Sequence, residues 1–249
     1  MTLRQITFAL LLSSMALVVT GCESAPGKPT TSSEIANPES VTDFTALYTA
    51  NCAACHGDHG KNGAAISLAN PVYLATASVA DIQRITAAGV SGTMMPGFGK
   101  AAGGMLTDRQ INILAQGMVS SWSNPGALSG QTPPSYASAS HGDPARGNTA
   151  YSAYCSRCHG NEGQVASVGL STGSAKAGPL VDPAYLALIS DQGLRSIIIA
   201  GQPDQGMPDW RGHANGSQAH VLSDQEITDI VAWLASHRTE TPGQPYRQQ

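Results

Sequence analysis

The chain has 249 residues, of which only 12% are charged and 5% aromatic, and its formal net charge is −4. This composition excludes a coiled coil, a polybasic nucleic-acid-binding protein and a multi-span membrane protein. It also leaves few large side chains with which to fill the cores of two domains.

Residues 1–22 have the pattern of an export signal. Arg4 is the one charged residue before Cys22, and a mostly apolar run of 14 residues follows it, over 6–19. That run is too short to cross about 30 Å of hydrocarbon as a helix, but it fits the apolar region of a signal peptide. The run ends in the letters VTGC, which resemble the lipobox of bacterial lipoproteins. The resemblance implies removal of residues 1–21 and a lipid on Cys22. An ordinary secretory signal and a retained anchor are the alternatives.

Residues 22–40 are polar and rich in Pro, Ser and Thr, so we expect a flexible tether. Glu23, rather than an aspartate, follows the modified cysteine, which resembles the sorting pattern of Gram-negative outer-membrane lipoproteins. The sequence therefore predicts an exported protein, lipid-anchored to a membrane that faces the periplasm. In a cell without an outer membrane, the anchor would lie on the outer face of the cell membrane.

The other four cysteines form two copies of one pattern, Cys52-Ala53-Ala54-Cys55-His56 and Cys155-Ser156-Arg157-Cys158-His159. Each is a C-x-x-C-H, the signature of c-type haem attachment. Cysteines at i and i+3 share a helix face, where each can add to a haem vinyl group, and the adjacent histidine reaches the iron. The sequence thus predicts two covalent haem c groups on these cysteines, with His56 and His159 as iron ligands.

Three competing interpretations of the cysteine pairs fit less well. A zinc ribbon needs its pairs about 15–20 residues apart, whereas 99 residues separate Cys55 from Cys155. A thioredoxin-like site needs a βαβ context, which the sequence does not indicate. Two local disulfides would leave both histidines unexplained.

The two motifs begin two copies of one sequence unit. Residues 68–96 align without gaps with 180–208, and a closing segment from Leu106 matches one from Leu222. Identical pairs include Pro71/Pro183, Tyr73/Tyr185, Leu74/Leu186, Gly89/Gly201, Met95/Met207 and Pro96/Pro208. The chain is therefore a tandem duplication.

Each copy runs from the C-x-x-C-H motif through an apolar middle and a Met-Pro pair to a closing helix. This order resembles class I cytochrome c, in which a methionine before the last helix is the sixth iron ligand. The resemblance implies Met207 in the second copy, since no other methionine follows Met118. In the first copy it implies Met95, with Met94 as the main rival. Met105 also competes, and Met118 is expected to pack in the core.

Five further histidines are alternative ligands: His59, His141, His213, His220 and His237. His59 follows His56 by three residues, so it cannot easily reach the opposite face of the iron. His213 and His220 lie in a polar loop, where we expect exposure to solvent.

Helix signals surround both motifs. Asp143-Pro144 predicts an N-cap followed by proline at the first helical position, and the four residues from Ser40 to Asp43 have capping-box spacing. Closing helices are expected over 107–122 and 223–237, from their helical apolar spacing.

Two further features are implied by the resemblance. First and last helices of class I cytochromes c cross at a glycine–aromatic contact, which here would be Gly147 with Trp233. In the first copy the partners would be swapped, as Phe44 with Gly117. A backbone carbonyl also accepts the proximal histidine N–H. It would lie in the second copy's segment 178–180, and in the first copy Ser67 would supply it.

We therefore expect an all-α protein of two small class I cytochrome c domains, each built around one haem. The expected segments are a signal peptide (1–21), tether (22–40), domain 1 (41–122), linker (123–142), domain 2 (143–238) and disordered tail (239–249). Two His/Met-ligated haems predict single-electron transfer between redox protein partners rather than catalysis. A fixed subunit of a larger respiratory complex is the first alternative. A dihaem peroxidase or thiosulfate dehydrogenase is the second.

Overall fold

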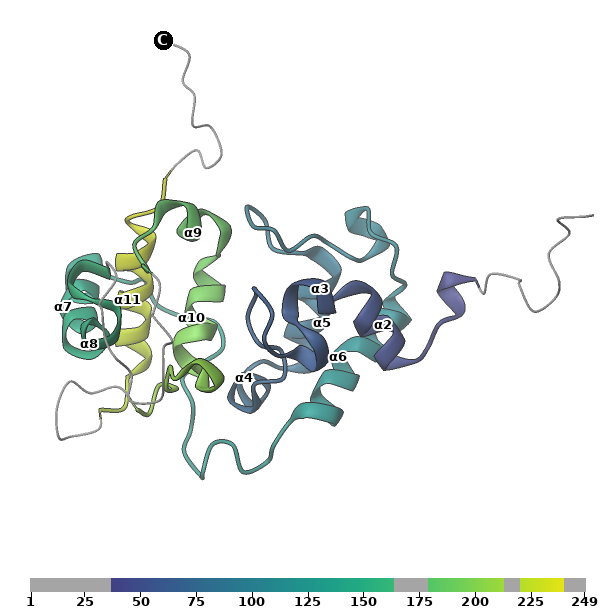
Figure 1. Ribbon diagram of the computed structural model, residues 1–249, viewed down its shortest axis with the longest axis horizontal. Helices are drawn as coiled ribbons and strands as arrows, with labels where there is room; N and C mark the ends of the chain where they lie inside the picture. Colours follow the sequence, from purple (N-terminus) through teal and green to yellow (C-terminus); the bar gives the residue numbers. More distant parts are fainter. Residues whose placement is uncertain (1–36, 164–178, 213–219, 240–249) are drawn as a thin grey trace, which may run out of the picture. The chain divides into compact units, whose positions relative to one another are not determined.

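The structure is a computed structural model that describes residues 37–163, 179–212 and 220–239 (Figure 1). The predicted signal peptide, Cys22 and most of the tether lie outside these ranges, as do His213 and residues 240–249. Regular structure within the described ranges is helical, apart from two isolated β-bridges. None of the helices found there is both long and apolar enough to span a membrane. The expected all-α architecture is confirmed.

The first copy contains four longer helices and three short turns of helix. They are α2 (Phe44–Asn51), α3 (Ala53–His56), η3 (Asp58–Gly60), α4 (Pro71–Thr76), α5 (Val79–Ala88), η4 (Lys100–Ala102) and α6 (Asp108–Trp122). A further turn, η2 (Pro38–Ser40), precedes them in the chain.

The second copy repeats this order element by element. It contains α7 (Pro144–Tyr154), α8 (Ser156–His159), η5 (Asn161–Gly163), α9 (Pro183–Leu188), α10 (Asp191–Ala200), η6 (Pro203–Gln205) and α11 (Asp224–Ala235). Helices α7 and α11 pack side by side, as Figure 1 shows, and α2 contacts α6 in the same way. The duplication read from the sequence is therefore a duplication of structure.

Side-chain caps fix where the main helices begin. Asp143 accepts from Arg146 N at 2.9 Å with Pro144 after it, as predicted. Thr107 and Ser223 each close a capping box at the start of α6 and α11. The prediction that Ser40 begins α2 is wrong. Asp43 is itself the N-cap and accepts from Ala46 N at 2.7 Å, because its carboxylate caps a helix as well as a serine does.

The glycine–aromatic crossing occurs in both copies, with the partners swapped as expected. A methyl group on Gly117 would lie 2.2 Å from Cδ2 of Phe44, and one on Gly147 would lie 2.7 Å from Cβ of Trp233. Each glycine therefore lets the first and last helices of its copy approach closely, while the aromatic ring fills the volume beside it.

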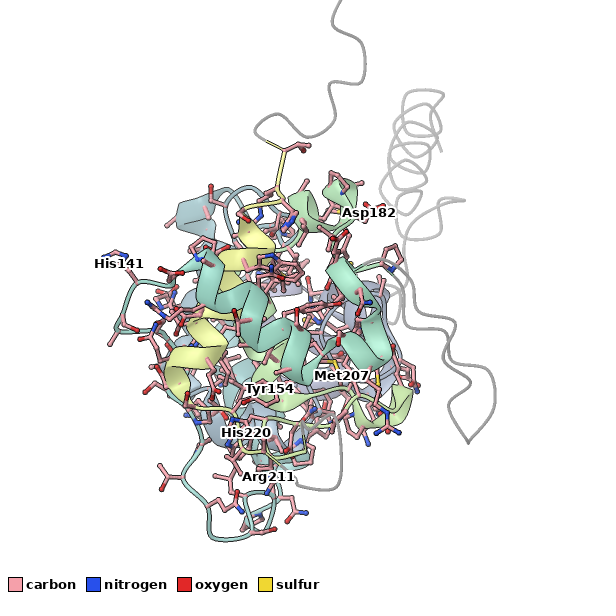
Figure 2. All side chains as sticks on the ribbon, turned by 90° about the vertical axis from the view of Figure 1, so that its left-hand side faces the viewer. His141, Tyr154, Asp182, Met207, Arg211 and His220 are labelled. Carbon is pink, nitrogen blue, oxygen red and sulfur yellow. The ribbon has the colours of Figure 1, made fainter. Side chains whose placement is uncertain are left out.

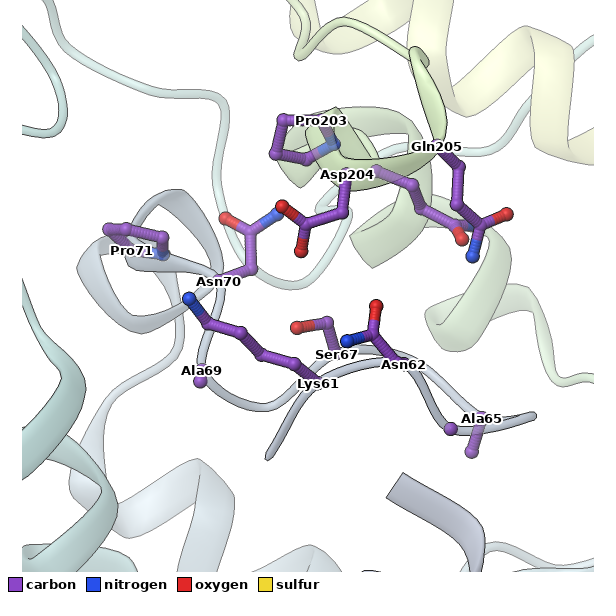
Figure 3. Close-up of a pocket in the computed structure, with 12 residues that line it drawn as sticks. Lys61, Asn62, Ala65, Ser67, Ala69, Asn70, Pro71, Pro203, Asp204 and Gln205 are labelled. Carbon is purple, nitrogen blue, oxygen red and sulfur yellow. The ribbon is translucent and has the colours of Figure 1, made fainter. Parts of the chain in front are cut away.

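The two copies meet where α4 packs against α10. The side chain of Asn70, at the start of α4, donates from Nδ2 to the carbonyls of Ala200 and Gly201, at 3.0 and 3.1 Å. Figure 3 shows the small cleft beside this contact, lined by loop residues that include Lys61, Asn70 and Asp204. One buried amide thus joins the two repeats.

The predicted linker has no helix, and part of it is bound to the second copy. Arg195 on α10 is 3% exposed and donates from Nη2 to Ser135 O at 2.8 Å. It also contacts Asp224 and donates to Thr228 Oγ1 at 3.0 Å. These bonds hold the segment around Ser135 against α10 and α11.

Candidate haem-binding sites

The first C-x-x-C-H motif lies at a break between two helices. Cys52 is the C-cap of α2, while Cys55 and His56 lie on the single turn of α3. Cys52 is buried and Cys55 is exposed, and neither forms a disulfide within the described residues. The motif ends at Gly57, whose φ of 79° suits glycine, and an added Cβ there would lie 1.7 Å from Lys61 O. The backbone therefore turns away directly after the histidine.

His56 is held in the orientation that a metal ligand requires. Its ring is buried, and Nδ1 lies 2.8 Å from the carbonyl of Ile66. A proton on Nδ1 leaves Nε2 with a free electron pair. Burial lowers the pKa of His56 below its ordinary value, although the bond to Ile66 opposes this shift, so the neutral ring is favoured.

The prediction that Ser67 supplies this carbonyl is wrong by one residue. Ser67 O instead accepts from Asn70 N at 3.4 Å, in the turn that precedes α4. Its hydroxyl donates to Gly60 O at 2.8 Å. Because the Ser67 carbonyl accepts a hydrogen bond within this turn, the carbonyl of the preceding residue, Ile66, is the one that faces His56.

The first cysteine of each motif has a thiol unlike those of redox or metal-binding cysteines. Burial raises the pKa of Cys52 to about 11 and that of Cys155 to about 12, and the neighbouring cysteine of each motif adds to the shift. Thiolate nucleophiles and zinc ligands need a lowered pKa instead. The raised pKa values of Cys52 and Cys155 therefore fit neither a redox site nor a zinc site.

The second motif repeats the geometry of the first. Cys155 is the C-cap of α7, and Cys158 and His159 lie on α8. In both copies a tyrosine four residues before the first cysteine braces the turn after the histidine. Tyr48 donates to Gly57 O at 2.9 Å and Tyr151 to Gly160 O at 2.7 Å. These tyrosines were not among the residues predicted from the sequence, although each lies at the same distance from the first cysteine of its motif. In segment 178–180, which is predicted to supply the accepting carbonyl, Gly178 lies outside the described residues.

The methionines of the first copy differ in exposure. Met94 and Met105 are 73% and 81% exposed, whereas Met118 is 2% exposed within α6. Met95 is half-buried, as is Met207 in the second copy. Both lie in the same kind of loop, since the carbonyl of each accepts a backbone N–H from five residues earlier at 2.9 Å. The choice of Met95 and Met207 as iron ligands stays a prediction.

Of the histidines outside the motifs that the structure describes, three are exposed and His220 is partly exposed. The His59 side chain is 76% exposed beside Asp58, and His141 and His237 are also exposed. The His220 side chain keeps 40% of its surface exposed, although its ring stacks on Tyr154 with centroids 4.3 Å apart and Nε2 contacts Glu226 at 3.1 Å. Figure 2 shows Tyr154 and His220 on the face that also carries Met207.

A family comparison identifies these sites. The family described as cytochrome C oxidase, cbb3-type, subunit III matches residues 39–116 and, separately, residues 142–234. The chain belongs to this family. Its two copies are therefore tandem helical cytochrome c domains, and membership implies covalent haem c and haem-based electron transfer.

Two other comparisons add little to this. No curated protein matches the cytochrome. Among solved structures, it is similar to a chain of the Kuenenia stuttgartiensis reducing HAO-like protein complex, at 20% identity and a TM-score of 0.44. The match covers 82% of the cytochrome and 100% of that chain. A likeness this loose carries no argument about function.

Proposed function

We propose that this cytochrome is a dihaem electron-transfer protein with one haem c in each domain. Cys52 and Cys55 would hold the first haem, and Cys155 and Cys158 the second. The observation that carries this proposal is the paired geometry of the two motifs, together with the buried, tautomer-fixed ring of His56. Haem supplies one-electron exchange when bound. The residues around it set ligand orientation, solvent access and charge.

We propose further that Met95 and Met207 are the sixth ligands. Partial burial and matching loops support this choice, while the exposure of Met94 points its side chain into solvent. Two protein ligands on each iron leave no position for a substrate, so electron exchange is the remaining chemistry. This ligation separates the proposal from a dihaem peroxidase or thiosulfate dehydrogenase, which needs an open or displaceable position.

Optical spectroscopy tests this ligation. The ferric protein should show a near-infrared methionine-to-iron band equivalent to two haems, and the ferrous protein should not bind carbon monoxide. Met95→Ala should remove half of the band and open one site to carbon monoxide, whereas Met94→Ala should leave both properties unchanged. A wild-type protein that binds carbon monoxide at one haem would contradict the proposal, and peroxide and thiosulfate would then be assayed as substrates.

We also propose that the cytochrome is exported and tethered to a membrane through lipid on Cys22. The lipobox-like end of the apolar N-terminal run supports this, as does the polar segment that follows it. Growth with a radiolabelled fatty acid, followed by purification, would test it. Cys22→Ser should abolish the label and release the protein from the membrane fraction.

A fixed subunit of a respiratory complex is the second candidate function. The description of the matched family, which names a subunit of an oxidase, favours it over a freely moving carrier. Mild detergent extraction followed by native separation distinguishes the two. A carrier would migrate alone, whereas a fixed subunit would co-migrate with membrane proteins in a constant ratio.

A further inference from the structure

Helix α9 presents an exposed, largely apolar surface, which we call the α9 face. It consists of Pro183, Ala184, Tyr185 and Leu188, all of which are exposed, with Leu188 at 52%. Leu186, on the opposite side of the same short helix, is fully buried. The α9 face therefore belongs to the surface, although most of its residues are apolar.

The corresponding face in domain 1 is covered. Helix α4 is the repeat counterpart of α9, and it packs against α10 of domain 2. Val72 and Tyr73, which align with Ala184 and Tyr185, are only 8% and 7% exposed. The Tyr73 hydroxyl also bonds to Tyr136 of the segment that Arg195 holds. In domain 1 this face is thus an interface with another cytochrome domain.

One substitution between the copies changes what the face can bind. Asn70 accepts from Val72 N with Oδ1 while Nδ2 donates to the carbonyls at the end of α10. Its counterpart, Asp182, caps α9 by accepting from Tyr185 N at 2.9 Å, but a carboxylate has no proton to donate. The carbonyl groups at the C-terminal end of a helix would be repelled by the Asp182 carboxylate, so a helix end cannot bind here as α10 binds Asn70. A cation can bind here instead.

The charge of the whole domain agrees with this local difference. Residues 143–238 contain nine acidic and six basic residues, while residues 41–122 contain four of each. Domain 2 therefore attracts a basic protein more strongly than domain 1 does. Figure 2 places Asp182 at the edge of domain 2, beside α9.

We propose that the α9 face docks a separate, basic redox protein, which covers Tyr185 and Leu188 with an apolar patch and places a lysine or arginine beside Asp182. This inference rests on the proposed electron-transfer function, since it names the class of partner that exchanges electrons with domain 2. A second copy of this chain is disfavoured, because its free α5 C-terminus would bring carbonyl oxygens toward Asp182.

The test uses the haem-loaded full-length protein in detergent and a basic single-domain mitochondrial-type cytochrome c as the probe. Stopped-flow absorbance gives the second-order rate of electron exchange at several ionic strengths. Leu188→Glu should lower this rate about tenfold or more, as expected for an anchor at the centre of an interface. Asp182→Asn should lower the rate at low salt and reduce its salt dependence.

Met105→Glu is the matched control, because it places the same charge at an exposed apolar position of domain 1. It should leave the rate within about twofold of wild type, as expected for a substitution outside the contact. Equal rates for wild type and Leu188→Glu, or an equal loss in Met105→Glu, would overturn the proposal. A wild-type dimer abolished by Leu188→Glu in sedimentation would identify a second copy as the occupant and would also overturn it.

Reduction by a small inorganic complex separates failure of docking from failure of the proposed function. Such a reductant needs no protein interface, so all three variants should be reduced as fast as wild type. If wild type fails to exchange electrons with it, the proposed electron-transfer function fails. If exchange is normal but Leu188→Glu has no effect with the probe, only the docking proposal fails.

Discussion

Asn70→Asp is the sharpest test of how the two domains are joined. Asn70 is 5% exposed, and its side chain makes four hydrogen bonds. The Oδ1 atom accepts from Val72 N and Tyr73 N at 2.9 and 3.2 Å, which caps α4. Nδ2 donates to Ala200 O and Gly201 O at 3.0 and 3.1 Å, at the C-terminal end of α10.

Aspartate keeps the cap but loses both donors. Asp and Asn are about equal as N-cap residues, so α4 itself should be unaffected. The carbonyls of Ala200 and Gly201 would be left facing a carboxylate, and each buried acceptor left without its donor costs about 1–3 kcal/mol. We therefore expect Asn70→Asp to lower the free energy of unfolding by about 2–6 kcal/mol, a large fraction of the usual 5–15 kcal/mol.

Guanidinium unfolding of the haem-loaded protein, followed by tryptophan fluorescence and by haem absorbance, measures this loss. Asp182→Asn is the matched control, since the same pair of residues is exchanged at the repeat counterpart, where no second domain is bound. At a protein concentration low enough to keep it monomeric, it should change stability by less than about 0.5 kcal/mol, as surface substitutions usually do. An Asn70→Asp protein as stable as wild type would refute the assignment of Asn70 as the joint between the domains.

Three further predictions concern single domains. Gly117→Ala should destabilise domain 1 by about 1–3 kcal/mol in thermal unfolding, because the new methyl overlaps the Phe44 ring; an unchanged midpoint would contradict the close crossing. Tyr48→Phe should cost about 1 kcal/mol by removing its bond to the turn after the haem motif, and chemical unfolding measures this. Burial alone would raise the pKa of Asp229, but hydrogen bonds from Arg146 and its neighbours hold that pKa below its usual range. The resulting stabilisation is complete above the unfolded pKa of about 3.9 and is lost as pH falls through the lower folded value. Asp229→Asn should therefore show a smaller loss of stability on acidification than wild type; a parallel pH profile would count against this.

The helices and the haem motifs could be predicted because their signals are local. The N-cap of α7 and both closing helices follow from cap residues and apolar spacing within one segment. Where two residues could each play one local role, the prediction failed. Ser40 and Asp43 can both cap a helix, and Ile66 and Ser67 both offer a carbonyl. Which of them does so depends on the turn geometry around them rather than on residue type.

The joint between the domains could not be predicted, because nothing in the sequence marks which surface of a repeat will be covered. Tyr73 and Tyr185 are identical, yet one is buried and the other exposed. The Asn70/Asp182 difference was visible in the alignment. Its effect on the contact between the domains can be recognised only once the carbonyls of Ala200 and Gly201 are known to accept from Asn70.

The way the two domains join also bears on whether a further copy could be added. It is a head-to-tail contact, since α4 of one repeat binds the end of α10 in the next, and such contacts can add further copies without limit. Both surfaces needed for continuation are present, because the α9 face is exposed and Ala88, the counterpart of the buried Ala200, is exposed at the end of α5. We expect Asp182 to oppose this continuation, since its carboxylate would face the negative end of that helix. Asp182→Asn therefore restores the missing donors, and we expect it to promote concentration-dependent self-association in sedimentation. A variant that stays monomeric at all concentrations would show that something other than this carboxylate limits the contact.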